Sequence, residues 1–151
     1  MGSLLRVVTQ PNNDSACLIL RVLLAVVFFA HGAQKVLGWF GGRGLEATMA
    51  YFTKVHHLPV ELAVLPIAAE FLGSIGLFLG LLTRVAAFAI AVDMAVAVYL
   101  VHLKFGFFVN WSGKQPGEGF EFHILVFAIA LALMIKGSGS WSVDRLISRK
   151  S

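Results

Sequence analysis

Four long apolar blocks limit the fold of this chain more than any other feature. They cover about residues 16–38, 59–82, 85–103 and 120–136. Each approaches the length of about 20 residues with which an α-helix crosses a hydrocarbon core. With 58% hydrophobic and 13% charged residues, the chain is also more apolar than a water-soluble domain normally is. We therefore predict an all-α membrane protein, built as an antiparallel bundle of four transmembrane helices.

The connectors predict how these helices are joined. From Leu45 to His56, apolar residues recur at helical spacing, which indicates a short helix lying on the membrane interface between the first two spans. The pair Thr83-Arg84 is the whole loop between the second and third blocks, so these two helices must form a tight antiparallel hairpin. The fourth block is short for a span and should cross with little tilt or thin the bilayer.

The first block could also be the apolar part of a signal peptide, but three further spans favour an uncleaved first helix. We expect a single membrane domain with a short tail at each end. The ranges are 1–15 for the N-terminal tail, 16–147 for the membrane domain and 148–151 for a basic C-terminal tail.

Charge and cysteine content exclude several function classes. The 12 Lys and Arg residues lie singly at block ends and in connectors rather than in a patch, so we expect no nucleic-acid partner. The single cysteine, Cys17, excludes paired-cysteine redox chemistry. We find no nucleotide-binding glycine loop and no haem, flavin or metal motif. The basic residues slightly favour cytoplasmic termini by the positive-inside rule.

Several short motifs carry a family resemblance. They are the RVLL run at Arg21, His31-Gly-Ala-Gln-Lys35, Gly38-Trp-Phe-Gly-Gly-Arg-Gly44, Glu70-Phe-Leu-Gly-Ser74, Gly119-Phe-Glu-Phe-His123 and Gly137-Ser-Gly-Ser-Trp-Ser-Val-Asp144. In this order they resemble the DoxX family of small four-helix membrane proteins, over about residues 16–147. The resemblance implies a bacterial or archaeal inner-membrane protein. Its relatives include the small subunit of thiosulfate:quinone oxidoreductase and partners of oxidative-stress enzymes.

Every predicted span carries an ionisable residue, which is costly in a bilayer and usually faces the bundle interior. Counting about 1.5 Å per residue from the basic residues at the inner block ends places His31, Glu70 and His123 at one level. Glu121 falls slightly further out. His31, Gln34 and Lys35 share one face of the first helix. We therefore predict a polar pocket that opens toward the outer side.

Such a pocket would suit a quinone, whose headgroup needs hydrogen-bond donors, a proton-passing group and apolar walls. The predicted ligand-binding residues are His31, Gln34, Lys35, Trp39, Glu70, Glu121 and His123, with His31 and Glu70 as candidate proton relay. Phe28, Phe71, Phe122 and Trp39 are the predicted walls.

Some residues in the spans could instead have purely structural roles. Arg21 and Asp93 are expected to form an ion pair between the first and third helices. His31 and Glu70 could instead make interhelical hydrogen bonds, and a haem held by His31 and His123 has only weak support. The glycines Gly73, Gly76 and Gly80 are read as close-packing positions.

Three functions remain open from the sequence. The first is a redox-associated subunit that binds a quinone or similar lipophilic ligand and works with a partner oxidoreductase, and is not a complete enzyme alone. The second is a non-catalytic scaffold or assembly factor that docks soluble redox or stress enzymes. The third, least favoured, is a proton-coupled carrier of a small solute, for which the chain lacks an inverted repeat. The bilayer is an expected partner in all three, and self-association stays open.

Overall fold

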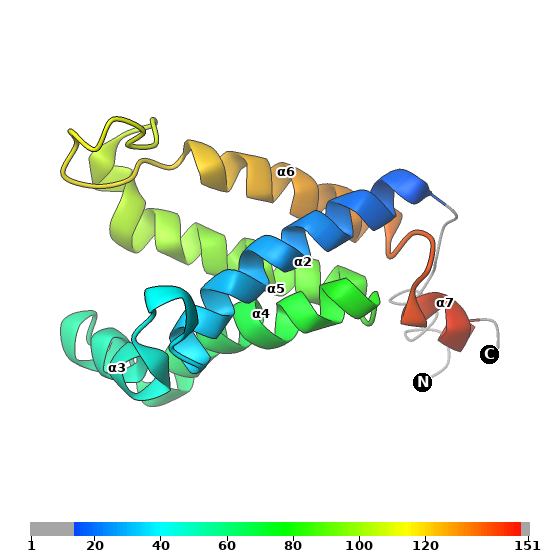
Figure 1. Ribbon diagram of the computed structural model, residues 1–151, viewed down its shortest axis with the longest axis horizontal. Coiled ribbons are helices and arrows are strands. Elements are labelled where there is room, and N and C mark those ends of the chain that lie inside the picture. Colours follow the sequence, from blue (N-terminus) through cyan, green and yellow to red (C-terminus); the bar gives the residue numbers. More distant parts are fainter. Residues whose placement is uncertain (1–13, 149–151) are drawn as a thin grey trace.

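Four long helices lie side by side in the computed structural model, which describes residues 14–148 (Figure 1). They are α2 (Ser15–Val36), α4 (Val60–Leu79), α5 (Thr83–Ala97) and α6 (Glu121–Lys136). Helix α4 packs between α2 and α5, and α6 packs mainly on α5 and also on α2. No strand occurs in this part of the chain. The predicted all-α bundle is therefore present.

Three of these helices are long and apolar enough to cross a membrane. They are residues 15–36, 60–79 and 83–105, the last of which counts α5 together with the short turns η3 (Val98–His102) and η4 (Leu103–Phe105) that continue it. Helix α6 has 16 residues and so spans only about 24 Å. That length is short of a hydrocarbon core of roughly 30 Å, as the sequence indicated.

The bundle has its apolar side chains both inside and outside, as expected of helices that face lipid. Phe28, Ile90 and Leu133 are buried in the core, while Phe88 and Leu125 are 59% and 64% exposed on the outer faces. A helix that is apolar all round is typical of a membrane span, because lipid tails accept the outer face.

A short helix is also present between the first two long helices, where the sequence predicts one. It consists of α3 (Gly44–Ala50) and one wider turn, η2 (Tyr51–Val55), and it follows the short turn η1 (Trp39–Gly41). Thr48 ties it to the end of α2, since its hydroxyl donates to the carbonyl of Lys35 at 3.2 Å. This helix and the connector after η4 lie at the same end of the bundle (Figure 1).

The opposite end is closed by the segment that leads into α7 (Val143–Ser148). Arg21 is fully buried there, and its guanidinium donates to the carbonyls of Leu77 and Trp141, each at 3.0 Å. Asp144 is also buried and accepts from the backbone N–H groups of Leu82 and Thr83. These contacts bind the end of the described chain to the hairpin between α4 and α5.

Candidate functional site

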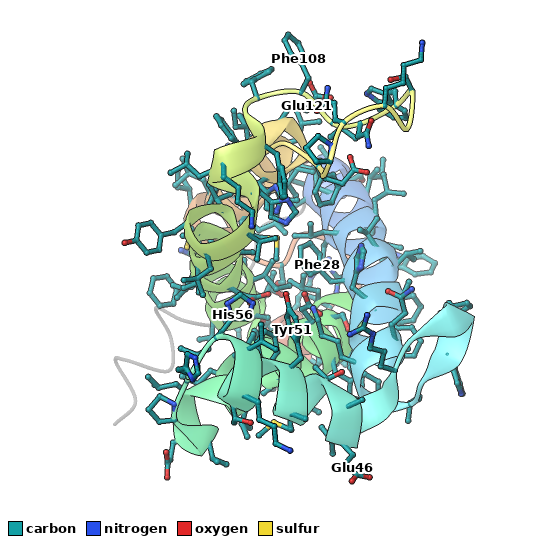
Figure 2. The ribbon with its side chains drawn as sticks, turned by 90° about the vertical axis from the view of Figure 1, so that its left-hand side faces the viewer. Phe28, Glu46, Tyr51, His56, Phe108 and Glu121 are labelled. Carbon is teal, nitrogen blue, oxygen red and sulfur yellow. The ribbon has the colours of Figure 1, made fainter. Side chains whose placement is uncertain are left out.

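A cavity of about 810 Å³ lies between the helices at the connector end of the bundle. This volume falls in the range of pockets that hold small organic molecules. Figure 2 looks onto this end, with Phe28 between the helices and Glu121 near the connector. The lining is mostly apolar, and its polar side chains are His31, Lys35, Glu70, His102, Trp111, Glu118, Glu121 and His123.

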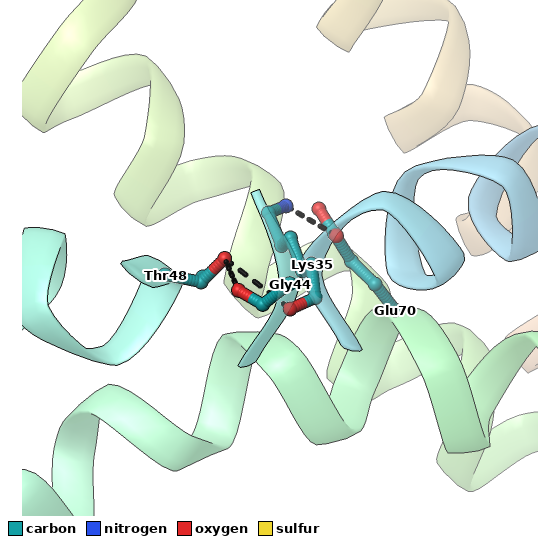
Figure 3. Close-up of polar contacts among 4 residues, drawn as sticks. All are labelled: Lys35, Gly44, Thr48 and Glu70. Atoms are coloured by element: carbon teal, nitrogen blue, oxygen red, sulfur yellow. Dashed lines mark hydrogen bonds and ion pairs between the residues drawn. The ribbon is translucent and has the colours of Figure 1, made fainter. Parts of the chain in front are cut away.

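The inner part of the cavity contains an ion pair between two helices. The Lys35 ammonium on α2 donates to Glu70 Oε2 on α4 (Figure 3). Glu70 is only 3% exposed, whereas the side chain of Lys35 keeps 29% of its surface accessible. The carboxylate is therefore held in the wall of the bundle and the ammonium reaches toward the opening. A pair of this kind stabilises both charges inside a low-dielectric site.

Asp93 on α5 lies beside this pair. It interacts electrostatically with Glu70 and Lys35 and is close enough to Glu70 for a side-chain hydrogen bond. The predicted ion pair between Arg21 and Asp93 is therefore not the arrangement found. Arg21 instead donates to backbone carbonyls at the closed end and faces Asp144. Backbone carbonyls at that end accept from both Nη atoms of the guanidinium, and among the described residues only its Nε has no acceptor.

Two histidines meet at the outer part of the cavity. The rings of His102 and His123 lie 4.3 Å apart between centroids. His102 Nδ1 pairs with the carbonyl of Glu118 at 2.8 Å, while His123 Nδ1 is buried without a hydrogen-bond partner among the described residues. His31 is exposed although it also lines the cavity, and its ring lies 6.4 Å from that of Phe28 between centroids. Within residues 14–148, no three His, Cys, Asp or Glu residues are grouped so that they could hold a metal ion.

The connector between α5 and α6 folds over the mouth of the cavity. Its turn is fixed by Asn110, which accepts from the N–H of Gln115 and donates from its own N–H to Glu118. Trp111 reaches back to the start of α6, where its indole N–H donates to Glu121 Oε1 at 3.3 Å. The connector thereby contributes to the cavity lining.

Most of the predicted ligand-binding residues come together in this cavity. His31, Lys35, Glu70, Glu121 and His123 all line it.

Gln34 and Trp39 are not among the lining residues. The amide of Gln34 donates to the carbonyl of Phe40, and the indole of Trp39 is 53% exposed next to the Phe40 ring. Gln34 lies in the last turn of α2 and Trp39 begins the turn η1 that follows it, so both side chains belong to the end of α2 and its turn rather than to the cavity lining. Of the predicted walls, Phe71 stacks on Phe29 instead.

His102, Trp111 and Glu118 were missed by the sequence analysis. None of the three was predicted to line the pocket. The signal that could have identified them is the antiparallel order of the third and fourth spans, which places the end of one beside the start of the other, so that the connector must lie at these helix ends.

The chain is similar to a known protein family and to several known proteins. The sequence model of the DoxX family matches residues 16–103. A Bacillus subtilis protein named "Putative oxidoreductase CatD" is 29% identical over 138 residues, covering 91% of each chain. The Escherichia coli "Inner membrane protein YqjF" is 28% identical over 91% of this chain and 96% of its own. "Uncharacterized membrane protein Rv3486" of Mycobacterium tuberculosis is 28% identical over 94% of this chain and 87% of its own. No solved structure gives a significant match.

Proposed function

Because this chain belongs to the DoxX family of membrane proteins, we propose that it is a redox-associated subunit that binds a quinone or a similar lipophilic molecule in its intramembrane cavity. It would act with a partner oxidoreductase in the inner membrane of a bacterium or archaeon. The names of two relatives, "Putative oxidoreductase CatD" and "Inner membrane protein YqjF", support both parts of this proposal.

The observation that carries the proposal is the cavity itself. It joins apolar walls such as Phe28 and Met94 to a few polar groups from three helices, including His31, Lys35 and Glu70. A quinone headgroup is flat and has two carbonyl oxygens that accept hydrogen bonds, and its tail is apolar. The Lys35 ammonium and the His31 imidazole can donate to such oxygens, and the apolar lining suits the ring and the first part of the tail.

The partner is needed because a quinone takes up two electrons and two protons when it becomes a quinol. This chain carries no nucleotide-binding glycine loop, so the electrons would come from a reduced cofactor of the partner protein. What this chain supplies is binding, orientation and groups that can hold protons at the cavity.

Purification in a mild detergent, followed by mass spectrometry of the co-extracted lipophilic molecules, tests the proposal. We expect a quinone to accompany the native protein and to be largely lost from Glu70→Gln and His31→Ala variants that still run as a folded species. Glu61→Gln and His57→Ala serve as matched controls, because both residues are exposed and neither lines the cavity.

A native protein that carries no lipophilic ligand would contradict the proposal. So would variants at His31 and Glu70 that retain the quinone as well as the two controls do. Either result would favour the scaffold function, in which the cavity residues only join helices.

A further inference from the structure

The register of the hairpin formed by α4 and α5 brings two carboxyl groups together inside the bundle. Gly73 faces Ile90, and Gly76 faces Ala86. Three residues before Gly73 and three residues after Ile90, the same antiparallel register places Glu70 opposite Asp93. Side-chain positions agree, since the two carboxyl groups are within hydrogen-bond reach of each other.

The charges in this place do not balance if both carboxyl groups are ionised. Lys35 is the cation that interacts with both of them. Two carboxylates beside one ammonium would leave a net negative charge at membrane depth, which is costly. When two carboxyl groups share a site, one of them normally keeps its proton.

The hydrogen bonding of Asp93 leads to the same conclusion. Its Oδ2 is buried and has no hydrogen-bond donor among the described residues. A buried carboxylate oxygen without a donor is rare in native structures. A proton located between Glu70 and Asp93 would satisfy this oxygen, because each carboxyl group could then donate to the other.

We propose that Glu70 and Asp93 share one proton beside the Lys35 ammonium, so that the cluster is neutral and can give this proton to an acceptor in the cavity. Glu70 lines the cavity, whereas Asp93 is not among the lining residues and interacts with Glu70. Asp93 is therefore a positioning residue, which acts through Glu70.

The use of this proton rests on the proposed function. When a bound quinone receives two electrons from the partner, one of the two protons that it takes up would come from the Glu70 carboxyl group and the other from water at the cavity mouth. The cluster then holds two carboxylates and one ammonium until water entering through the cavity mouth returns a proton. The like charges left behind favour that return.

Infrared spectroscopy of the purified protein without added ligand tests the shared proton, because the C=O stretch of a protonated carboxyl group is separate from the bands of carboxylates. We expect such a band at neutral pH in the native protein. It should be lost in Asp93→Asn and in Glu70→Gln, since each variant leaves one carboxylate paired with Lys35. It should rise about two-fold in Lys35→Met, where both carboxyl groups need a proton to avoid a buried charge.

Glu121→Gln is the matched control. Glu121 lines the same cavity but is bound by Trp111, so its removal should leave the band unchanged. Size-exclusion chromatography shows which variants remain folded, and the two single carboxyl variants suffice for the test if Lys35→Met does not fold.

A native protein without the band, or a band that persists in both Asp93→Asn and Glu70→Gln, would overturn the inference. These outcomes are independent of the ligand. A band that behaves as expected in a protein that never carries a quinone would support the shared proton and contradict the proposed function. A bound quinone without the band would do the opposite.

Discussion

Arg21 and Asp144 come from opposite ends of the described chain and are both buried against the turn between α4 and α5. Arg21 donates to the carbonyl of Leu77, at the end of α4, and Asp144 accepts from the N–H groups of Leu82 and Thr83, at the start of α5. The two side chains also attract each other electrostatically. The carbonyl groups at the end of α4 thus meet a cation, and the N–H groups at the start of α5 meet an anion. This is the arrangement that the helix dipoles favour.

Replacing Asp144 with Ala should destabilise the protein by about 3 kcal/mol. The change leaves two backbone N–H groups without their acceptor and removes the charge that faces Arg21. Unfolding in mild detergent, followed by circular dichroism, measures the loss. Glu46→Ala is the control, because Glu46 is an exposed acidic residue in the first turn of α3, and it should cost less than about 1 kcal/mol. Equal losses in the two variants would contradict the role of Asp144.

Gly80→Ala should be far more damaging than Gly113→Ala, although both glycines have nearly the same backbone conformation. Their φ angles are +66° and +67°. An alanine at either position therefore destabilises the protein by about 1 to 2 kcal/mol, because the left-handed conformation is unfavourable for it. A Cβ at Gly80 would lie 2.0 Å from Arg21 Nη1, whereas nothing lies within 4 Å of one at Gly113. The same unfolding measurement should show at least about 1 kcal/mol more loss at Gly80. Losses of the same size would mean that the guanidinium moves away without cost.

Much of this architecture could be predicted from the sequence, because apolar blocks and short loops determine which helices are neighbours. The hairpin of α4 and α5 is one example. The pairing of Glu70 with Asp93 could not be predicted in the same way. A loop centred on Thr83-Arg84 places Glu70 opposite Ala97, about one helical turn from Asp93.

The actual turn comes earlier because Gly80 and Leu82 both adopt a left-handed conformation, with φ of +66° and +48°. Gly80 ends α4 as a glycine commonly does after a helix. Leu82 is strained in this region, and the bond from its N–H to Asp144 helps to hold it there. The register of the two carboxyl groups therefore depends on a residue about 60 positions further along the chain, which no local pattern reveals.

The glycines at helix contacts also differ between the sequence-based prediction and the structure. A Cβ at Gly32 would lie 2.7 Å from the backbone of Phe71, so this glycine allows α2 and α4 to cross closely. The sequence analysis assigned close packing to Gly73, yet a Cβ there meets Ile90 only at an ordinary 3.8 Å. Gly32→Ala should therefore destabilise the bundle by about 1 to 3 kcal/mol. Gly73→Ala should be neutral or stabilising by up to about 1 kcal/mol, because alanine favours the helix. Thermal unfolding of the two variants in one detergent decides between them, and a reversed order would contradict the close contact at Gly32.

Trp111 and Trp141 offer a test of the cavity mouth. Their side chains are 88% and 87% exposed, but Trp111 lines the cavity and Trp141 lies at the closed end of the bundle. Truncating either indole should change the free energy of unfolding by less than about 1 kcal/mol. Trp111→Ala should nevertheless reduce the amount of co-purified lipophilic ligand several-fold, because it removes part of the mouth, while Trp141→Ala leaves it unchanged. Equal retention in both variants would show that the mouth plays no part in holding the ligand.

The orientation in the membrane is the remaining prediction, and it decides from which side water reaches Glu70. Arg21 and Arg84 are folded inward, where Arg84 donates to the carbonyl of Met134 at 2.7 Å. They still count in the positive-inside rule, because that rule acts on the charges while the helices are being inserted. The termini should therefore be cytoplasmic and the cavity mouth should face outward.

Single cysteines in a Cys17→Ala background test this orientation in intact cells. Ser112→Cys, in the exposed connector, should react with a membrane-impermeant maleimide, whereas Leu146→Cys, on the exposed side of α7, should react only after the cells are broken. The native Cys17 is 3% exposed and should remain unlabelled in both conditions. The reverse pattern would place the cavity mouth on the cytoplasmic side. A partner that reduces the bound molecule could then be a soluble cytoplasmic enzyme reaching the mouth directly, whereas the predicted orientation requires a partner that reaches the outer side.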